Sequence, residues 1–335
     1  MYKELLLKVM DGQNLNSRES AGMINDILSG KLTDAQIAAF ITAMAIKGET
    51  YEELAGAATA MRSKAAKLQT LSSTVVDTCG TGGDGLNTFN ISTAAAFVVA
   101  GAGITVAKHG NRSVSSKCGS ADVLEKLGVN LEVDPETVEM AVNEIGIGFM
   151  FAPKFHGAMK YAAPARREVG IRSIFNMLGP LTNPAAASCQ LLGVYKPQLT
   201  EMFAQALNQL GCKRAFVVHG HDGLDEITIC DNTRVSELNN GHIKTYDIYP
   251  EKYFSQYSEP DTLVGGDADI NAGIIEDIFS GKKGPQRNIV AINAAAAIVA
   301  GGKAKNLDEG LKTACDVLDQ GKASAKLNEL VEFVK

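Results

Sequence analysis

A glycine-rich segment is the first place where this sequence could bind a ligand. It follows an expected strand and reads Asp77-Thr78-Cys79-Gly80-Thr81-Gly82-Gly83-Asp84-Gly85, and an apolar helix begins shortly after it. Backbone N–H groups at a helix start attract anions, because the helix dipole also favours negative charge there. The spacing of Gly80, Gly82 and Gly83 excludes the dinucleotide-binding G-x-G-x-x-G, and no Gly-Lys-Ser/Thr completes a P-loop. The segment therefore predicts a site for a mononucleotide-like phosphate.

A second loop, after the next expected strand, carries the charges that a phosphorylated substrate needs. It contains Lys108, Arg112, Lys117 and four serines. Parallel strands bring their carboxyl ends to one edge of a sheet, so this loop should face the glycine-rich segment across one crevice. Its donors suit a metal-bound substrate with several negative charges. The alternatives are a tight turn capped by Asn90 or Ser92 for the first segment, and a solvated loop lysine for Lys117.

Two neighbouring carboxylates follow a third expected strand. Asp225 and Glu226 can reach one Mg²⁺, which commonly bridges protein carboxylates and phosphate oxygens. His219 and His221 stand nearby, but no third nitrogen or sulfur ligand has a spacing that would complete a zinc site. The alternative for the acidic pair is a solvated turn. Two further segments can be explained by structure alone. Arg166 lies in a segment that ends an expected helix, where the helix dipole favours a cation. Residues 175–184 contain two prolines and can be interpreted as a rigid connection.

Together and in this order, the motifs resemble those of the anthranilate phosphoribosyltransferases, over essentially the whole chain. The motifs are Gly80-Thr81-Gly82-Gly83-Asp84, Thr88-Phe89-Asn90-Ile91-Ser92-Thr93, Lys108-His109-Gly110-Asn111-Arg112, Gly119-Ser120-Ala121-Asp122, residues 175–184 and Asp225-Glu226. The resemblance implies transfer of the phosphoribosyl group of 5-phospho-α-D-ribose 1-diphosphate (PRPP) to the amino group of anthranilate. The products would be N-(5-phosphoribosyl)anthranilate and diphosphate, in a step of tryptophan biosynthesis. It also implies Mg²⁺, a homodimer, and a small helical domain hinged to a larger α/β domain.

The resemblance also implies residue roles. Around PRPP it places Gly80, Gly83, Asp84, Thr88, Asn90, Ile91, Ser92, Thr93, Lys108, His109, Gly110, Asn111, Arg112, Ser113, Val114, Ser115, Ser116 and Ser120. It assigns Ser92, Asp225 and Glu226 to the metal, and Gly80, Asn111 and Arg166 to anthranilate. The last assignment agrees with the chemistry, because a guanidinium recognises a carboxylate with paired donors. We assign catalytic roles to Lys108 and Arg166, and consider His109 a candidate general base.

The chain departs from the family's usual pattern at two places near the expected acceptor site. The family has a His-His-Pro-like run where this chain has Phe155-His156-Gly157, and a valine where Ala165 stands. In the family the missing His and Pro line the approach of anthranilate. The departure therefore concerns the entry path of the acceptor, whereas the phosphate and metal motifs are intact.

Short β-branched runs that alternate with helical windows after Lys67 predict a mostly parallel sheet flanked by helices, as in nucleoside phosphorylases and phosphoribosyltransferases. The expected strands span residues 74–78, 104–107, 129–133, 147–151, 190–195 and 214–219, with a hairpin over 233–246. The expected helices span residues 92–100, 120–127, 135–145, 155–168, 200–210 and 285–300. This α/β domain, residues 71–335, would bind PRPP.

The first 70 residues predict a small all-helical domain. Thr33 with Gln36, and Thr50 with Glu53, have capping-box spacing. The resemblance implies that a segment near residues 167–187 joins this domain. The apolar stripe Ile37, Phe40, Ile41 and Met44 recurs at helical spacing and could face the other domain or a second subunit. A unit this small cannot bury the stripe alone, so we expect a homodimer through the N-terminal helices.

Composition limits the function classes. The 335 residues include 32 Lys and Arg against 38 Asp and Glu, a net charge of −6 without basic runs, which argues against nucleic-acid binding. The six cysteines form no C-x-x-C pair, and no signal peptide or membrane-spanning stretch is evident, so we expect a cytoplasmic protein. Two alternatives to the transferase are a pyrimidine nucleoside phosphorylase-like enzyme and a non-catalytic paralogue that binds nucleic acid. Nucleoside phosphorolysis would reveal the first, and a basic surface the second.

Overall fold

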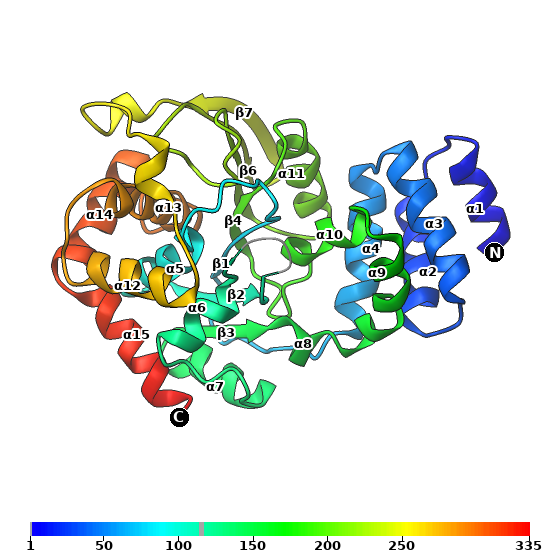
Figure 1. Cartoon of the computed structure of the whole chain (residues 1–335), viewed down its shortest axis with the longest axis horizontal. Coiled ribbons are helices and arrows are strands. Elements are labelled where there is room, and N and C mark those ends of the chain that lie inside the picture. Colours follow the sequence, from blue (N-terminus) through cyan, green and yellow to red (C-terminus); the bar gives the residue numbers. More distant parts are fainter. Residues whose placement is uncertain (1, 114–116) are drawn as a thin grey trace.

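The fold consists of a helical bundle beside a larger α/β domain (Figure 1). The computed structural model describes residues 2–113 and 117–335. The bundle begins with α1 (Tyr2–Met10), α2 (Ser17–Leu28), α3 (Asp34–Lys47) and α4 (Tyr51–Lys64). Both expected capping boxes are confirmed. Thr33 and Thr50 accept the backbone N–H three residues later, and the Gln36 and Glu53 side chains accept the N–H of the capping threonine. These bonds satisfy N–H groups that have no partner inside the helix.

Seven strands of the described chain form one sheet in the order β3-β2-β1-β4-β5-β6-β7. They are β1 (Val75–Gly80), β2 (Thr105–Gly110), β3 (Ile147–Phe151), β4 (Cys189–Gly193), β5 (Arg214–Gly220), β6 (Thr233–Asn239) and β7 (His242–Ile248). The first five are parallel, so their carboxyl ends meet at one edge of the sheet. The expected hairpin is formed by β6 and β7, and Asn240 and Gly241 at its turn have φ of 48° and 88°. The expected mostly parallel sheet is confirmed.

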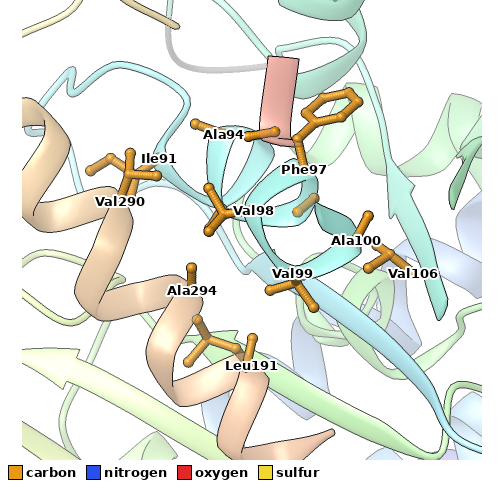
Figure 2. Packing of buried hydrophobic residues seen from close by; sticks show 14 of the residues in the cluster. Ile91, Ala94, Phe97, Val98, Val99, Ala100, Val106, Leu191, Val290 and Ala294 are labelled. Carbon is orange, nitrogen blue, oxygen red and sulfur yellow. The ribbon is translucent and has the colours of Figure 1, made fainter. Parts of the chain in front are cut away.

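Helices cover both faces of this sheet. They are α5 (Ile91–Gly101), α6 (Ser120–Lys126), α7 (Pro135–Glu144), α11 (Leu199–Gln209), α12 (Ala268–Phe279), α13 (Pro285–Ala300), α14 (Leu307–Asp319) and α15 (Lys322–Phe333). Leu191 of β4 belongs to the core that α5 and α13 cover, whereas the adjacent Leu192 belongs to a core shared with α11 and the bundle. Figure 2 shows Val98 and Val99 of α5 close to Val290 and Ala294 of α13. Small residues on α13 allow this close packing.

The apolar stripe of α3 is buried inside the chain. Ile37, Phe40, Ile41 and Met44 are each at most 1% exposed. They join a core that includes Ala165, Ile174 and Phe175, from beyond residue 160. The expectation that this stripe faces a second subunit is therefore wrong. The bundle does not need a partner chain to cover it, because later segments of the same chain do so.

Two expected elements are wrong. Residues 129–133 were expected to form a strand, but in the described structure they form no strand and connect α6 to α7. Their side chains alternate between buried and exposed. β2 pairs directly with β3, which leaves this segment to pack one side against the core. The expected helix over 155–168 is divided into α8 (Ala152–Phe155), a 3₁₀ turn (Gly157–Tyr161) and α9 (Ala163–Val169). Pro164 lies in the first turn of α9, where its missing N–H does no harm.

Short helices follow α9 and bring the chain back to the sheet. They are α10 (Ile174–Leu178) and the 3₁₀ turn η2 (Gly179–Leu181), and two more 3₁₀ turns, η3 (Pro250–Lys252) and η4 (Pro260–Leu263), follow β7. α9 packs against α3, and α10 packs against α3 and α4, next to the bundle in Figure 1. The described residues contain no helix long and apolar enough to cross a membrane.

Candidate active site

The glycine-rich segment leads from β1 to an open helix end. Asn90 stands at the N-cap of α5, but its side chain makes no capping hydrogen bond. It donates instead to the carbonyl oxygen of Cys118 (3.3 Å) and accepts from Nδ2 of Asn271 (2.9 Å). Asn90 is therefore not an ordinary cap, and the first bond joins α5 to the loop after β2, as expected. The first turn of α5 is suited to an anion.

A side chain at either of two glycines in this segment would displace a neighbouring side chain. A Cβ on Gly80 would lie 2.5 Å from Oδ2 of Asp225. Gly83 has a φ of 77°, and a Cβ there would lie 1.4 Å from Nη2 of Arg172. The backbone at these two glycines therefore lies close to the Asp225 and Arg172 side chains. Ile91, expected near the substrate, points its side chain into the core, so only its backbone can face a ligand (Figure 2).

Lys108 is buried at the end of β2 rather than extended from a loop. It is 4% exposed, and its Nζ donates to the Thr78 carbonyl oxygen and lies 3.3 Å from Oγ of Ser92. Burial lowers the pKa of Lys108, while the Asp77 charge opposes that change. The amino group of Lys108 therefore lies beneath the first turn of α5, which contains Ser92. Thr93 is also buried there, and its hydroxyl has no partner in the described structure.

The rest of the second loop is divided between the site and α6. The Ser120 hydroxyl donates to the carbonyl oxygen of Asn111 (3.3 Å), which brings these two predicted residues together. Arg112 instead pairs with Asp122 (3.0 Å) and Glu125 (2.9 Å) of α6. Ser113 is also held by α6, because its backbone N–H donates to Asp122 (3.0 Å). The predicted residues Val114, Ser115 and Ser116 lie outside the described residues.

The acidic pair lies against the glycine-rich segment, with Asp225 half-buried and Glu226 buried. Oδ2 of Asp225 accepts the backbone N–H of Gly82 (2.8 Å), and Glu226 is only 7% exposed. Burial, with a further contribution from Asp84, raises the pKa of Asp225 to about 8. Burial and the Asp225 charge raise the pKa of Glu226 well above its usual value. The pair is therefore not a solvated turn, and the alternative of a solvated turn is wrong.

These residues fit a magnesium ion that also binds phosphate. Asp84, Asp225 and Glu226 repel one another, and a divalent cation between them would relieve that repulsion. Oε2 of Glu226 is buried without a hydrogen-bond partner in the described structure, which leaves it available as a ligand. Among the described residues, no three His, Cys, Asp or Glu side chains are grouped so that they could hold a metal ion by themselves. Mg²⁺ does not need one, because phosphate oxygens and water complete its shell.

His109 is buried against a second histidine. Its Nδ1 lies 3.2 Å from the Gly179 carbonyl oxygen, and its ring centre lies 5.0 Å from that of His156. Burial lowers the pKa of His109 to about 3 and that of His156 to about 4. Both rings are therefore neutral at physiological pH. A group with so low a pKa binds protons weakly, so this environment does not favour His109 as a general base.

Arg166 presents a guanidinium that has no ionic partner among the described residues. It lies on α9, half-buried, with its Cζ 5.3 Å from the ring centre of Phe175. Burial lowers its pKa, and the described residues include no carboxylate that pairs with it. A guanidinium stacked on an aromatic ring with a free donor edge is suited to a flat carboxylate.

Two further residues hold the site in place, and no spacing pattern predicted either. Nη2 of Arg172 donates to the carbonyl oxygens of Gly82 (3.2 Å) and Gly83 (3.0 Å), and its Cζ lies 4.0 Å from the ring centre of Tyr195. Nδ2 of Asn183 donates to Oδ2 of Asp77 (2.7 Å) and to the carbonyl oxygen of Ala107 (2.8 Å). Asn183 thus fixes the proline-rich connection to β1 and β2, in agreement with its interpretation as a rigid connection.

Comparison with known proteins decides the family. Residues 72–324 match the glycosyl transferase family a/b domain, and residues 3–65 match the helical bundle domain of the same family. The anthranilate phosphoribosyltransferase of Desulfosudis oleivorans is 64% identical over 336 residues, which cover 100% of this chain and 99% of the relative. The chain belongs to the anthranilate phosphoribosyltransferase family. The resemblance seen in the motifs is therefore confirmed.

Solved structures agree with this membership. The anthranilate phosphoribosyltransferase of Thermus thermophilus superimposes with a TM-score of 0.93 at 41% identity, over 98% of both chains. The Saccharomyces cerevisiae anthranilate phosphoribosyltransferase, solved in complex with PRPP and Mg, superimposes with a TM-score of 0.89 at 27% identity, over 99% of this chain and 98% of that one. The predicted fold class, a helical domain with a mostly parallel α/β domain, is confirmed.

Proposed function

We propose that this chain transfers the phosphoribosyl group of PRPP to the amino group of anthranilate, and releases diphosphate. The observation that carries the proposal is that a chain of this family combines three features: the open start of α5, the acidic pair beside it, and an Arg166 that has no ionic partner among the described residues. The first two suit a magnesium-bound diphosphate, and the third suits an aromatic carboxylate. The reaction makes the chain a pentosyltransferase of tryptophan biosynthesis.

Asp225 and Glu226, with Ser92 beside them, would hold Mg²⁺. When bound, the ion would supply positive charge to the departing diphosphate. Within residues 80–85, the N–H groups of Thr81 and Gly82 already donate to Gly193 and Asp225, so the chain itself would contribute those of residues 83–85 and of the first turn of α5. Lys108 adds positive charge below Ser92, which it contacts at 3.3 Å. Together these groups stabilise the negative charge that develops on the leaving group, the main requirement when the anomeric carbon becomes positive.

Arg166, with Asn111 and the Gly80 backbone, would orient anthranilate. The guanidinium would bind the carboxylate through paired donors and direct the amine towards the anomeric carbon, a proximity effect. The aniline nitrogen is a weak base, and it can lose its proton after the carbon–nitrogen bond has begun to form. No residue is therefore required as a strong general base, consistent with the low pKa of His109, about 3.

A direct assay tests the proposed function. The protein is mixed with anthranilate, PRPP and Mg²⁺, and anthranilate fluorescence should fall with time. The loss should require all three components and should be accompanied by an equal amount of diphosphate. Unchanged fluorescence with folded protein would contradict the proposal, and phosphorolysis of a pyrimidine nucleoside by the same sample would support the phosphorylase instead.

We expect Arg172→Ala to raise the KM for PRPP several-fold while changing the KM for anthranilate little. Arg172 holds the carbonyl oxygens of Gly82 and Gly83, so its loss should loosen the phosphate-binding segment. Hydrogen bonds from a charged donor contribute roughly 1.5–3 kcal/mol when well formed, and less at an exposed position. Steady-state kinetics measure both constants. Arg167→Ala, the removal of another exposed arginine, is the control and should leave the KM for PRPP unchanged.

We also propose a homodimer in the cytoplasm. Leu7 and Met10 of α1 and Ile46 of α3 are 49%, 65% and 82% exposed, although they are large and apolar. This surface, rather than the buried stripe of α3, would meet a second copy through the N-terminal helices. All six cysteines are free thiols, which suits a reducing compartment.

Sedimentation tests the dimer. We expect wild type to sediment as a dimer at micromolar concentration, and Met10→Glu with Ile46→Glu to sediment as a monomer, because charge disrupts an apolar contact. Met140→Glu with Ile270→Glu, at exposed apolar residues of the α/β domain, is the matched control. Wild-type protein that sediments as a monomer would contradict the proposal.

A further inference from the structure

A cavity of about 210 Å³ lies between η4 and the start of α13, apart from the candidate active site. It is lined by Thr262, Ile278 and residues 282–287. The volume is many times the roughly 10–15 Å³ that one water needs. A small polyatomic ligand therefore fits.

The lining is cationic. It contains Lys282, Lys283 and Arg287 and no carboxylate. The carboxylates that face these cations from neighbouring helices are Asp277, 2.7 Å from Lys282, and Asp319, which pairs with Lys283 and with Arg287 (2.9 Å). Three cations thus face two carboxylates. The start of α13, a helix of 16 residues without a side-chain cap, adds its dipole and first-turn N–H groups.

Arg287 gives a second and independent indication of a ligand. It is only 4% exposed, and its Nη2 binds Asp319 (2.9 Å) and the Cys315 carbonyl oxygen (3.4 Å). Its Nη1 is also buried and has no hydrogen-bond partner among the described residues. A buried charged donor without an acceptor is costly, and few such groups occur in native proteins. Nη1 does not reach the cavity surface as the side chain stands, so a turn of the guanidinium would bring it to an oxyanion in the cavity, which would provide the acceptor.

We propose that this cavity binds an inorganic oxyanion of the phosphate class, held by Arg287, the two lysines and the start of α13. The site goes beyond the proposed function and is separate from the phosphate site at α5. It has a physical connection to that site, because Thr262 precedes Leu263, whose carbonyl oxygen accepts the N–H of Phe89 (3.2 Å). Gly265 in turn donates to the Asn87 carbonyl oxygen (2.9 Å). An anion that orders η4 would therefore order residues 87–89 beside α5.

Calorimetric titration with inorganic phosphate tests the site. Wild type should bind two phosphates per chain, one at each site, and one phosphate when PRPP already fills the first. Lys282→Ala with Lys283→Ala should weaken the second binding event at least tenfold. Both lysine side chains are more than 60% exposed, so this variant should fold. Lys303→Ala with Lys305→Ala, at exposed lysines elsewhere, removes the same charge and should bind phosphate as wild type does.

Hydrogen exchange gives a readout at the connecting segment. Phosphate added to PRPP-saturated wild type should slow exchange in peptides that contain Phe89 and Gly265, and should not do so in the Lys282/Lys283 variant. Unchanged phosphate binding in that variant, or no heat from PRPP-saturated wild type, would overturn the proposal. Failure of the proposed function can be told apart from failure of this proposal. The titration of wild type and variant with inorganic phosphate alone requires neither PRPP binding nor turnover, so it tests the cavity even if the chain does not transfer a phosphoribosyl group.

Discussion

Replacement of Asp225 by Asn together with Glu226 by Gln should abolish most activity and shift the Mg²⁺ requirement upward. The half-buried Asp225 and the buried Glu226 lie near Asp84, next to a segment suited to a strongly anionic substrate. Without a cation between them, they would repel that substrate. The amide variants keep the shape and the oxygen that accepts the Gly82 N–H, but they lose the charge that holds the ion. Activity titrated with Mg²⁺, in wild type and in the variant, measures the effect.

The fold of this double variant should be intact. Burial and mutual repulsion raise the pKa of both carboxyls in the folded state, so ionisation at neutral pH costs stability that neutral amides do not. We therefore expect the melting temperature of the metal-free variant to equal or exceed that of wild type. Anthranilate binding without PRPP should barely change.

A matched control separates charge from position. Asp308 and Glu309 are also adjacent, but they are exposed on α14. Asp308→Asn with Glu309→Gln should leave the Mg²⁺ titration unchanged, since exposed substitutions usually stay within about ±0.5 kcal/mol. Superimposable Mg²⁺ curves for wild type and the Asp225/Glu226 variant would contradict the assignment of the metal site.

Arg166→Ala should raise the KM for anthranilate by about 10- to 150-fold. The half-buried guanidinium has no ionic partner in the described part of the chain, and the contact that it would make with a carboxylate contributes roughly 1.5–3 kcal/mol. Arg166→Lys should restore only part of the affinity, because an ammonium cannot donate in a planar pair. Steady-state kinetics with each substrate varied in turn measure the change.

The neighbouring Arg167 is an internal control for this variant. It is exposed on the same helix, so Arg167→Ala should change neither KM. If Arg166→Ala instead raises the KM for PRPP and leaves that for anthranilate unchanged, then Arg166 belongs to the other substrate.

The elements of the sheet could be predicted because local chemistry determines them. Short β-branched runs gave five parallel strands, and Asn239-Asn240-Gly241 gave the hairpin, since its turn needs positive φ. Residues 129–133 alternate between buried and exposed side chains, unlike the continuously buried parallel strands, and form no strand, because a strand also needs a neighbour and β2 already pairs with β3. Periodicity reports which side of a segment is buried, and not which backbone it pairs with.

The site was predictable in outline and not in its supporting contacts. The glycine-rich segment and the acidic pair carry their chemistry in adjacent residues, so each could be recognised alone. Arg172 could not, because it reaches Gly82 and Gly83 across a separation of about 90 residues. Arg112 could not be placed either, because only the fold brings Asp122 and Glu125 within its reach. The burial of the α3 stripe by α9 and α10 is another contact that depends on the fold alone.

The shared core of the bundle and the sheet also has a consequence during synthesis on the ribosome. α4 packs against α10 and α11, and about 130 residues separate α4 from α11. At roughly 5–20 residues per second, α11 follows α4 by on the order of ten seconds. During that interval the apolar faces of the first four helices have been made, but the segments that cover them have not. The nascent chain therefore offers chaperones a binding surface that the finished protein does not display.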